Sequence, residues 1–293
     1  MHISLYLGYM KLKIIETGLF KLDGGAMFGV VPKQMWKNMN PPDQNNMCTW
    51  TMRCLLVDDG QRVILFDTGM GTKQGEKFRS HFEPHGPDSL VNSLHEAGYK
   101  PEDITDVFQT HFHFDHVGGA LVKDDKGDIV PQFPNATYWS NEKHLEWSLN
   151  PNDRERASFL IENIKPLKDH GVLKFIDIED GVHFTDTITV DFYWGHTEAM
   201  MVPTIHLPKG EKLVFTADLL PSAHHVRMPY IMSYDIRPLE TLRDKARFYE
   251  KACNTDSYIF FEHDKDTVLG QLIKDDRGRY GIQNIESSRL FGS

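Results

Sequence analysis

The sequence predicts an α/β fold in which two mixed β-sheets pack together with helices on the outside. Short apolar runs typical of strands dominate the chain, several of them form hairpins, and helices interleave with these hairpins. Strict alternation of one strand with one helix would instead favour a doubly wound parallel sheet. The 293 residues are 40% hydrophobic and 25% charged, which is typical of a globular protein. No repeat, low-complexity tract or Ser/Gly linker marks a boundary, so we expect a single domain over residues 1–293.

The first predicted elements are a β-hairpin and a helix. Residues 51–57 and 62–66 are apolar runs on either side of an Asp-Asp-Gly turn, and the second run has the composition of a fully buried strand. A helix is expected after Pro87, with Asp88 as its cap and Gly98 as its end.

The remaining predicted elements are short apolar strands and two further helices. We expect strands at 104–110, 137–139, 201–207, 212–216 and 257–261, several short β-type runs within 172–194, and helices at 141–149 and 238–251.

Residues 24–46, called the arm below, differ from the rest of the chain. They combine prolines and amides with apolar side chains that include Met27, Phe28 and Trp36, and they show little periodicity. Compact domains rarely keep such a segment without a function, so one hypothesis is a long loop that lines a substrate pocket or joins a homodimer. The alternative is a loop that packs its own aromatic side chains against the core.

The composition excludes several classes of function. With 32 basic and 42 acidic residues the net charge is −10, so we expect no nucleic-acid partner and no anionic membrane partner. No run approaches the roughly 18 apolar residues of a membrane helix. Residues 1–20 lack a signal-peptide cleavage site, and Met10 could equally be the start. The three cysteines match no metal-binding spacing, which predicts reduced thiols in a cytoplasmic protein.

The segment 111–116 carries metal-ligand side chains at four of its six positions and follows a predicted buried strand. Imidazole and carboxylate groups are common metal ligands. If the motif begins extended, His111, His113 and Asp115 point to the same side, because side chains alternate along a strand. His116 then faces a different direction, so this one loop could contribute ligands to two metal ions.

Three further candidate ligands stand directly after predicted apolar strands. They are His196, Asp218 and His263, and strand ends are where packed sheets commonly place active sites. A purely structural metal site is the alternative, although structural zinc favours cysteine over aspartate.

The order of these motifs resembles the metallo-β-lactamase fold superfamily of hydrolases. The resemblance implies an αβ/βα sandwich with a two-metal site at one edge of the sheets. It rests on Asp67-Thr68-Gly69, the 111–116 motif, Gly195-His196-Thr197, Asp218 and His263. It implies that His111, His113 and His196 bind one metal, that Asp115, His116 and His263 bind the other, and that Asp218 bridges both. Asp67 and Thr197 would support the ligands from behind, as neighbours of metal ligands commonly do.

Within the superfamily, the chain is most similar to the branch of N-acyl-homoserine-lactone lactonases and organophosphate (methyl-parathion) or aryl-ester hydrolases. The local matches are DGGAMFGV at 23–30, DTGMG at 67–71 and DLLPSAHH at 218–225. Some lactonases carry a tyrosine three residues after the bridging aspartate, where this chain has Pro221. We expect His224, His225 or Tyr230 to take its place.

The resemblance implies a metal-dependent hydrolase in which a metal-bridging hydroxide attacks a small lactone or ester, including N-acyl-homoserine lactones in quorum quenching. Zinc is the expected metal, with manganese, cobalt or iron as alternatives. Asp115 would also take the transferred proton, and Met27, Phe28, Trp36 and His224 would line the substrate pocket. The alternatives are a phosphotriesterase or aryl esterase, and a metal-binding module without catalysis.

Overall fold

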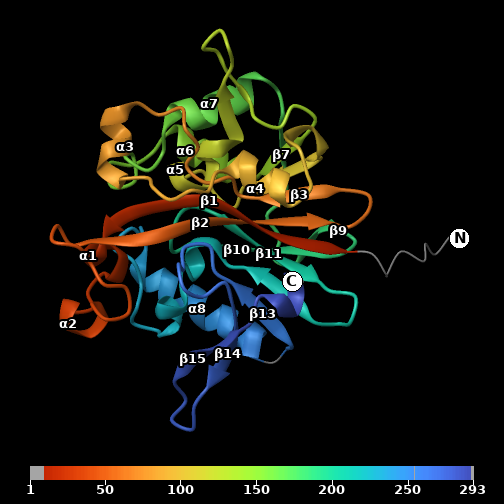
Figure 1. Ribbon diagram of the computed structural model, residues 1–293. Helices are drawn as coiled ribbons and strands as arrows, with labels where there is room; N and C mark the ends of the chain where they lie inside the picture. Colours follow the sequence, from red (N-terminus) through yellow and green to blue (C-terminus); the bar gives the residue numbers. More distant parts are fainter. Residues whose placement is uncertain (1–9, 254, 292–293) are drawn as a thin grey trace, which may run out of the picture.

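The computed structural model describes residues 10–253 and 255–291, and in them two β-sheets pack face to face with helices on their outer sides (Figure 1). Six strands form the first sheet in the order β1-β2-β3-β4-β7-β8, and seven form the second in the order β15-β14-β13-β12-β11-β10-β9. Each sheet contains both parallel and antiparallel pairs. The predicted sandwich of two mixed sheets with outer helices is therefore confirmed.

The strands and helices have the following bounds. The first sheet contains β1 (Lys11–Asp23), β2 (Met47–Asp58), β3 (Val63–Phe66), β4 (Asp106–Phe108), β7 (Thr137–Ser140) and β8 (Leu173–Phe175). The second contains β9 (Val182–Thr185), β10 (Ile188–Tyr193), β11 (Met200–His206), β12 (Lys212–Phe215), β13 (Ser257–Phe260), β14 (Leu269–Lys274) and β15 (Tyr280–Ile285). A separate hairpin joins β5 (Leu121–Lys123) to β6 (Ile129–Pro131). The α-helices are α1 (Gly24–Phe28), α2 (Lys33–Trp36), α3 (Glu76–Phe82), α4 (Leu90–Glu96), α5 (Phe114–Val117), α6 (Glu142–Leu149), α7 (Ile161–Asp169), α8 (Pro238–Cys253) and α9 (Ser288–Phe291).

Parallel strands bring the loops that matter to one edge of the sandwich. β3, β4 and β7 run parallel in the first sheet, and β12 and β13 run parallel in the second. The carboxyl ends of parallel strands lie on the same side of a sheet. The loops after β3 and β4 therefore lie close together, as do those after β12 and β13.

Within residues 10–253 and 255–291, buried apolar side chains form three clusters. The largest fills the space between the sheets, and the second lies between the first sheet and the helices that cover it, as the layered architecture requires. The third joins the arm to β1 and β2. In it Phe28 and Trp36 stack with ring centroids 4.9 Å apart and are 0% and 1% exposed. The arm thus contains two short helices, and its aromatic side chains pack into the core.

Other details differ from the sequence-based expectation. Ser89 caps α4 by accepting a hydrogen bond from the Asn92 backbone, whereas Asp88 was expected as the cap. The irregular burial pattern of β1 concealed this 13-residue strand, and Pro166 within α7 broke the pattern expected of a helix. Residues 1–9, which make up much of the segment considered for a signal peptide, lie outside the described residues.

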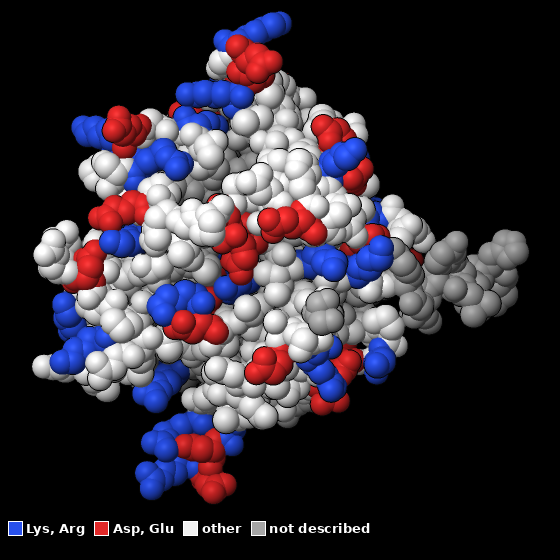
Figure 2. All heavy atoms as spheres, in the orientation of Figure 1, with Lys and Arg blue, Asp and Glu red and all other residues white. Residues whose placement is uncertain are grey.

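The surface shows no separation of charge on the face seen in Figure 2, where basic and acidic side chains are interspersed. Among the helices formed by the described residues, none is long and apolar enough to span a membrane. All three cysteines are free thiols, and Cys48 and Cys54 are buried.

Candidate metal centre

Two loops at the edge of the first sheet form the base of the site. The loop after β4 carries the 111–116 motif into α5, and the loop after β3 lies directly behind it. Thr68 donates hydrogen bonds from both its backbone nitrogen and its hydroxyl to the backbone oxygen of His116, each at 2.8 Å. A Cβ atom at Gly118 would lie 1.9 Å from the Met70 backbone oxygen. The two loops can therefore pack this closely only with glycine at position 118.

The seven candidate ligands converge although they come from four separate parts of the chain. The first group consists of His111, His113, His196 and Asp218, whose donor atoms all lie within 4.8 Å of one another. Nδ1 of His113 lies 3.1 Å from Nε2 of His111 and 3.1 Å from Nε2 of His196.

The second group consists of Asp115, His116 and His263. Nε2 of His116 and Nε2 of His263 are 3.2 Å apart. Asp218 lies between the two groups: its Oδ2 is 3.0 Å from Nε2 of His196, and its Oδ1 is 3.1 Å from Nε2 of His263. This is the position that a bridging carboxylate requires.

The outward-facing nitrogens of the histidines donate hydrogen bonds. The acceptors are Thr110 Oγ1 for His111 (3.0 Å), Glu155 Oε1 for His113 (3.1 Å), Asp67 Oδ2 for His116 (3.0 Å), Asp235 Oδ1 for His196 (2.9 Å) and the Thr51 backbone oxygen for His263 (2.7 Å). In the neutral form of each ring, the inward-facing nitrogen therefore presents a lone pair. Lone pairs that face one another at about 3 Å repel unless a cation lies between them. The donor set thus fits divalent metal ions of the kind that imidazole and carboxylate bind.

The electrostatic environment differs between the histidines. Against the lowering effect of burial, the Asp218 carboxylate raises the pKa of His196 to about 10 and that of His263 to about 9, so metal binding must displace a proton from each of these rings. Burial lowers the pKa of His111 well below its usual range and also lowers that of His113, so both rings are neutral at pH 7. Burial would raise the pKa of Asp218, but the nearby rings of His196 and His116 hold it well below its usual range. Asp218 is therefore an anion.

Solvent reaches part of the cluster. The side chains of Asp115, Asp218 and His113 are 10%, 8% and 6% exposed, whereas those of His111 and His116 are fully buried. Tyr234 is 36% exposed. Burial raises the pKa of its phenol, and the charge of Asp115 adds to the effect, so the phenol is within electrostatic reach of that carboxylate.

Three carboxylates of the site were not predicted. Glu155 and Asp235 accept hydrogen bonds from His113 and His196, and Oε2 of Glu262 lies 3.2 Å from Nδ1 of His116. Burial raises the pKa of Glu262 to about 7, although the His116 ring opposes this shift. Glu155 and Asp235 belong to irregular loops without a recognisable spacing. Only the position of Glu262 immediately before His263 could have pointed to it.

The two residues expected to support the ligands do so differently. Asp67 accepts hydrogen bonds from the Thr110 backbone nitrogen at 2.8 Å and the Thr110 hydroxyl at 2.6 Å, besides the one from His116. Thr197 donates its hydroxyl to Glu155 and so reaches His113 only through that carboxylate.

The residues expected to line a substrate pocket are mostly inside the protein. Met27, like Phe28 and Trp36, is almost fully buried, at 1% exposure. His225 accepts from the Ser222 hydroxyl at 2.7 Å and donates to the Met27 backbone oxygen at 2.9 Å, so both its nitrogens are occupied. Tyr230 is buried in the arm cluster, and His224 is half-buried. Direct contact of these side chains with a substrate stays a prediction.

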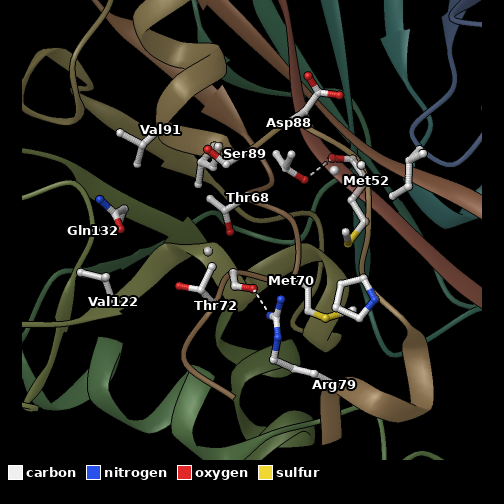
Figure 3. A pocket seen from close by; sticks show the side chains of 18 of the residues that line it. Met52, Thr68, Met70, Thr72, Arg79, Asp88, Ser89, Val91, Val122 and Gln132 are labelled. Atoms are coloured by element: carbon white, nitrogen blue, oxygen red, sulfur yellow. Dashed lines mark hydrogen bonds between the residues drawn. The ribbon is translucent and has the colours of Figure 1, made fainter. Parts of the chain in front are cut away.

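The loop after β3 also lines a cavity of about 340 Å³ (Figure 3). Thr68 and Met70 line it, and Arg79 donates a hydrogen bond across it to the Gly71 backbone oxygen at 2.9 Å. None of the seven candidate ligands is among the described residues that line this cavity. It is therefore separate from the metal centre.

Comparison with known families agrees with this geometry. The sequence profile of the Metallo-beta-lactamase superfamily matches residues 53–253, more than two thirds of the chain. The chain belongs to the metallo-beta-lactamase superfamily. The matched region contains six of the seven candidate ligands, and His263 follows it.

Superfamily members with curated functions are distant relatives. N-acyl homoserine lactonase AttM of Azorhizobium caulinodans is 22% identical over 181 residues, which cover 61% of this chain and 65% of that protein. N-acyl homoserine lactonase AiiA of Bacillus thuringiensis subsp. kurstaki is 32% identical over 119 residues, which cover 37% of this chain and 43% of that protein. The chain thus matches less than two thirds of the length of these relatives.

Solved structures of other proteins match over almost the whole chain. A probable metal-dependent hydrolase from Staphylococcus aureus superposes with a TM-score of 0.83 at 25% identity, covering 94% of this chain and 98% of the other. AidC, described as a dizinc quorum-quenching lactonase, superposes with a TM-score of 0.76 at 23% identity and covers 95% of both chains. These matches establish the fold.

Proposed function

We propose that this superfamily member is a hydrolase that binds two divalent metal ions and cleaves a small lactone or ester. The convergence of five imidazoles and two carboxylates, with Asp218 between the two groups, carries the proposal. N-acyl-homoserine lactones are the first substrates to test, because AttM and AiiA are described as N-acyl homoserine lactonases.

The donor groups divide between two ions. His111, His113 and His196 would hold one ion and Asp115, His116 and His263 the other, with Asp218 shared. Zinc suits these donors best, while manganese, cobalt or iron could also bind them. Bound divalent ions lower the pKa of a water ligand and polarise a carbonyl oxygen.

The protein's own groups would handle protons and substrate at the exposed part of the cluster. Asp115 has the most exposed side chain of the cluster, so its carboxylate is placed to accept the proton released when water attacks. The partly exposed phenol of Tyr234 would donate a hydrogen bond to the substrate or its leaving group. The buried orienting carboxylates keep the histidines fixed during this reaction.

A groove close to the site suits the apolar part of a substrate. Its volume is about 610 Å³, and Phe78, Phe159 and Leu160 line it. The ring of Phe159 lies 4.8 Å from that of His113, which places the groove beside the first metal group. An acyl chain or an aryl leaving group could occupy it. The arm would then support the site from within the core.

Metal analysis combined with a substrate panel tests the proposal. Purified protein should contain up to two divalent ions per chain, and it should hydrolyse at least one of a set of N-acyl-homoserine lactones, other lactones, aryl esters, phosphotriesters and thioesters. Removal of the metal should abolish turnover, and its return should restore it. Hydrolysis at the full rate by metal-free protein would overturn the mechanism.

The panel also separates the alternatives. Preferential cleavage of phosphotriesters or aryl esters would favour the organophosphate and aryl-esterase branch over lactonases. Two bound ions without turnover of any substrate would favour a metal-binding module. The single domain over residues 1–293 and a homodimer through the arm stay predictions, and light scattering at micromolar concentration tests the dimer.

A further inference from the structure

His113 can bind a metal only in one tautomer. Its Nδ1 faces the other rings, 3.1 Å from Nε2 of His111 and 3.1 Å from Nε2 of His196. Its Nε2 lies 3.1 Å from Oε1 of Glu155. A carboxylate only accepts hydrogen bonds, so the proton must be on Nε2. Glu155 therefore holds the lone pair of Nδ1 toward the metal position.

Glu155 is itself fixed by several donors. Its Oε2 accepts hydrogen bonds from Trp147 Nε1 at 2.7 Å and from Asn152 Nδ2 at 3.1 Å. Its Oε1 also accepts the hydroxyl of Thr197. The residue is 3% exposed. A carboxylate this deeply buried, with both oxygens occupied, has little freedom to move. The imidazole that donates to it is fixed as well.

The hydrogen bonds of Glu155 connect three separate segments. Trp147 belongs to α6, His113 to the loop after β4, and Thr197 to the loop between β10 and β11. The segment that carries Glu155 also contacts the 111–116 motif, because the Ser158 backbone oxygen accepts the Phe114 amide at 3.0 Å. Glu155 thus links α6 to the two loops that carry the histidines of the first group.

The carboxylates behind the site divide between the two metal groups. Glu155 and Asp235 accept from His113 and His196 of the first group, while Asp67 accepts from His116 of the second. His116 of the second group donates to Asp67, and His263 donates to the Thr51 backbone oxygen. Loss of the Glu155 side chain should therefore lower the metal affinity of the first group more than that of the second.

We infer that Glu155 is a positioning residue that fixes the tautomer and orientation of His113 and so sets the metal affinity of the first group selectively. This inference rests on the metal-binding part of the proposed function. It concerns a residue in the irregular segment between α6 and α7, outside the motifs by which the superfamily resemblance was drawn.

Metal affinity measured separately for each of the two ions tests the inference. The proteins are the wild type, Glu155→Ala, Glu155→Gln and the control Glu146→Gln, which changes an exposed glutamate on α6. Each is loaded with zinc, dialysed against graded chelator concentrations and analysed for bound metal. The cobalt-substituted proteins supply visible spectra that report the ligand geometry, and the melting temperatures of the metal-free proteins report folding.

Glu155→Ala should lower the binding affinity for one ion about 10- to 100-fold, as the loss of a hydrogen-bond partner of a metal ligand typically does. The affinity for the other ion should stay within about twofold of that of the wild type. Glu155→Gln should recover part of the affinity, because its amide oxygen can still accept from His113. The control should match the wild type. The visible spectrum of cobalt-substituted Glu155→Ala should change in the bands of the ion that binds more weakly.

Other outcomes would overturn the inference. Equal weakening of both ions, or unchanged affinity in Glu155→Ala, would show that Glu155 does not act selectively through His113. A lower melting temperature of the metal-free protein with unchanged affinities would indicate a role in folding alone. Absence of bound metal in the wild type would instead refute the proposed function, and so the two failures are distinguishable.

Discussion

The amide of Phe112 donates a hydrogen bond to Nε2 of His144 at 2.8 Å, from the middle of the 111–116 motif to helix α6. Nδ1 of His144 donates to the Glu198 backbone oxygen at 2.6 Å. His144 is therefore a neutral histidine in one fixed tautomer that connects the 111–116 motif to the loop that carries His196. Its side chain is fully buried, and burial lowers its pKa to about 4.

His144 should make the fold sensitive to acid. Its pKa is about 4 in the folded protein and about 6.5 in the unfolded chain. Below pH 6.5 the unfolded chain takes up a proton that the folded state does not bind, so stability present above pH 6.5 is lost as the pH falls toward 4. The gap corresponds to about 3 kcal/mol. Urea unfolding of metal-free protein between pH 8 and pH 4.5 measures this loss.

The variant His144→Asn isolates this contribution from those of other buried histidines such as His225. Asparagine cannot take up a proton in this range, so the free energy of unfolding should vary less with pH in the variant. Identical pH dependence in both proteins would contradict the assignment of the neutral state to His144.

Asp67 should control the second metal group. It accepts from Nδ1 of His116 at 3.0 Å and from the Thr110 hydroxyl at 2.6 Å. Asp67→Asn keeps only one oxygen, so it cannot accept from the Thr110 backbone nitrogen, the Thr110 hydroxyl and His116 together, and the bond to His116 is weakened. We expect about 10- to 100-fold weaker binding of the ion held by the second group. Substitution of Glu155 should instead weaken binding of the ion held by the first group. Chelator titration measures it, with Asp177→Asn on the surface as the control. Simultaneous loss of the same ion in both variants would contradict the division of the carboxylates.

The seven candidate ligands could be predicted because each follows an apolar strand, a local pattern that the sequence carries. Asp218, for example, follows the end of β12 at Phe215, and His263 follows the end of β13 at Phe260. Glu155 and Asp235 have no such pattern. Their role depends on tertiary contacts with His113 and His196, residues about 40 positions away. Local sequence carries no information about contacts of this kind.

The arm shows a second limit of sequence reasoning. Its composition predicted an irregular functional segment, because its prolines and amides interrupt any period. The structure buries Phe28 and Trp36 through contacts with β2 and with the loop after β12, such as the stack of Phe28 on His225 at 5.1 Å. Burial of an aperiodic segment depends on the surface it meets, and that surface is formed by distant residues.

Gly118 should tolerate no side chain. A Cβ atom there would lie 1.9 Å from the Met70 backbone oxygen, and backbone atoms in two packed loops cannot move aside cheaply. Gly118→Ala should lower the free energy of unfolding by about 1–3 kcal/mol or more, and metal affinity should fall with it. Denaturant unfolding and metal analysis measure the two effects. The control is Gly281→Ala, where the nearest atom, Cγ1 of Ile273, would lie at an ordinary 3.7 Å. Equal stability of both variants would contradict the close approach.

Tyr234 should contribute to turnover more than to folding. It is 36% exposed and within electrostatic reach of Asp115. Tyr234→Phe keeps the ring and removes only the hydroxyl. If the phenol donates to the substrate during the reaction, kcat should fall about tenfold, equivalent to about 1.4 kcal/mol, while the melting temperature stays within error. Steady-state kinetics on the best substrate of the panel test this. Unchanged kcat would place the hydroxyl outside the reaction.

Substitutions of Trp36 test whether the arm only supports the core or also contacts substrate. The ring is 1% exposed, stacks on Phe28, and donates from Nε1 to the Val31 backbone oxygen at 3.1 Å. Trp36→Ala should therefore cost about 3–5 kcal/mol of stability, as is typical for a buried aromatic side chain. Urea unfolding measures this cost. Trp36→Phe, which retains an aromatic ring, should lose less.

The kinetics of Trp36→Phe separate the two roles, because this variant should remain folded. If the arm only supports the core, KM should change by the same factor for short-chain and long-chain substrates. A larger increase in KM for the long-chain substrates would show that the arm contacts the acyl chain. Since the ring is enclosed by the core in the structure, we expect equal factors.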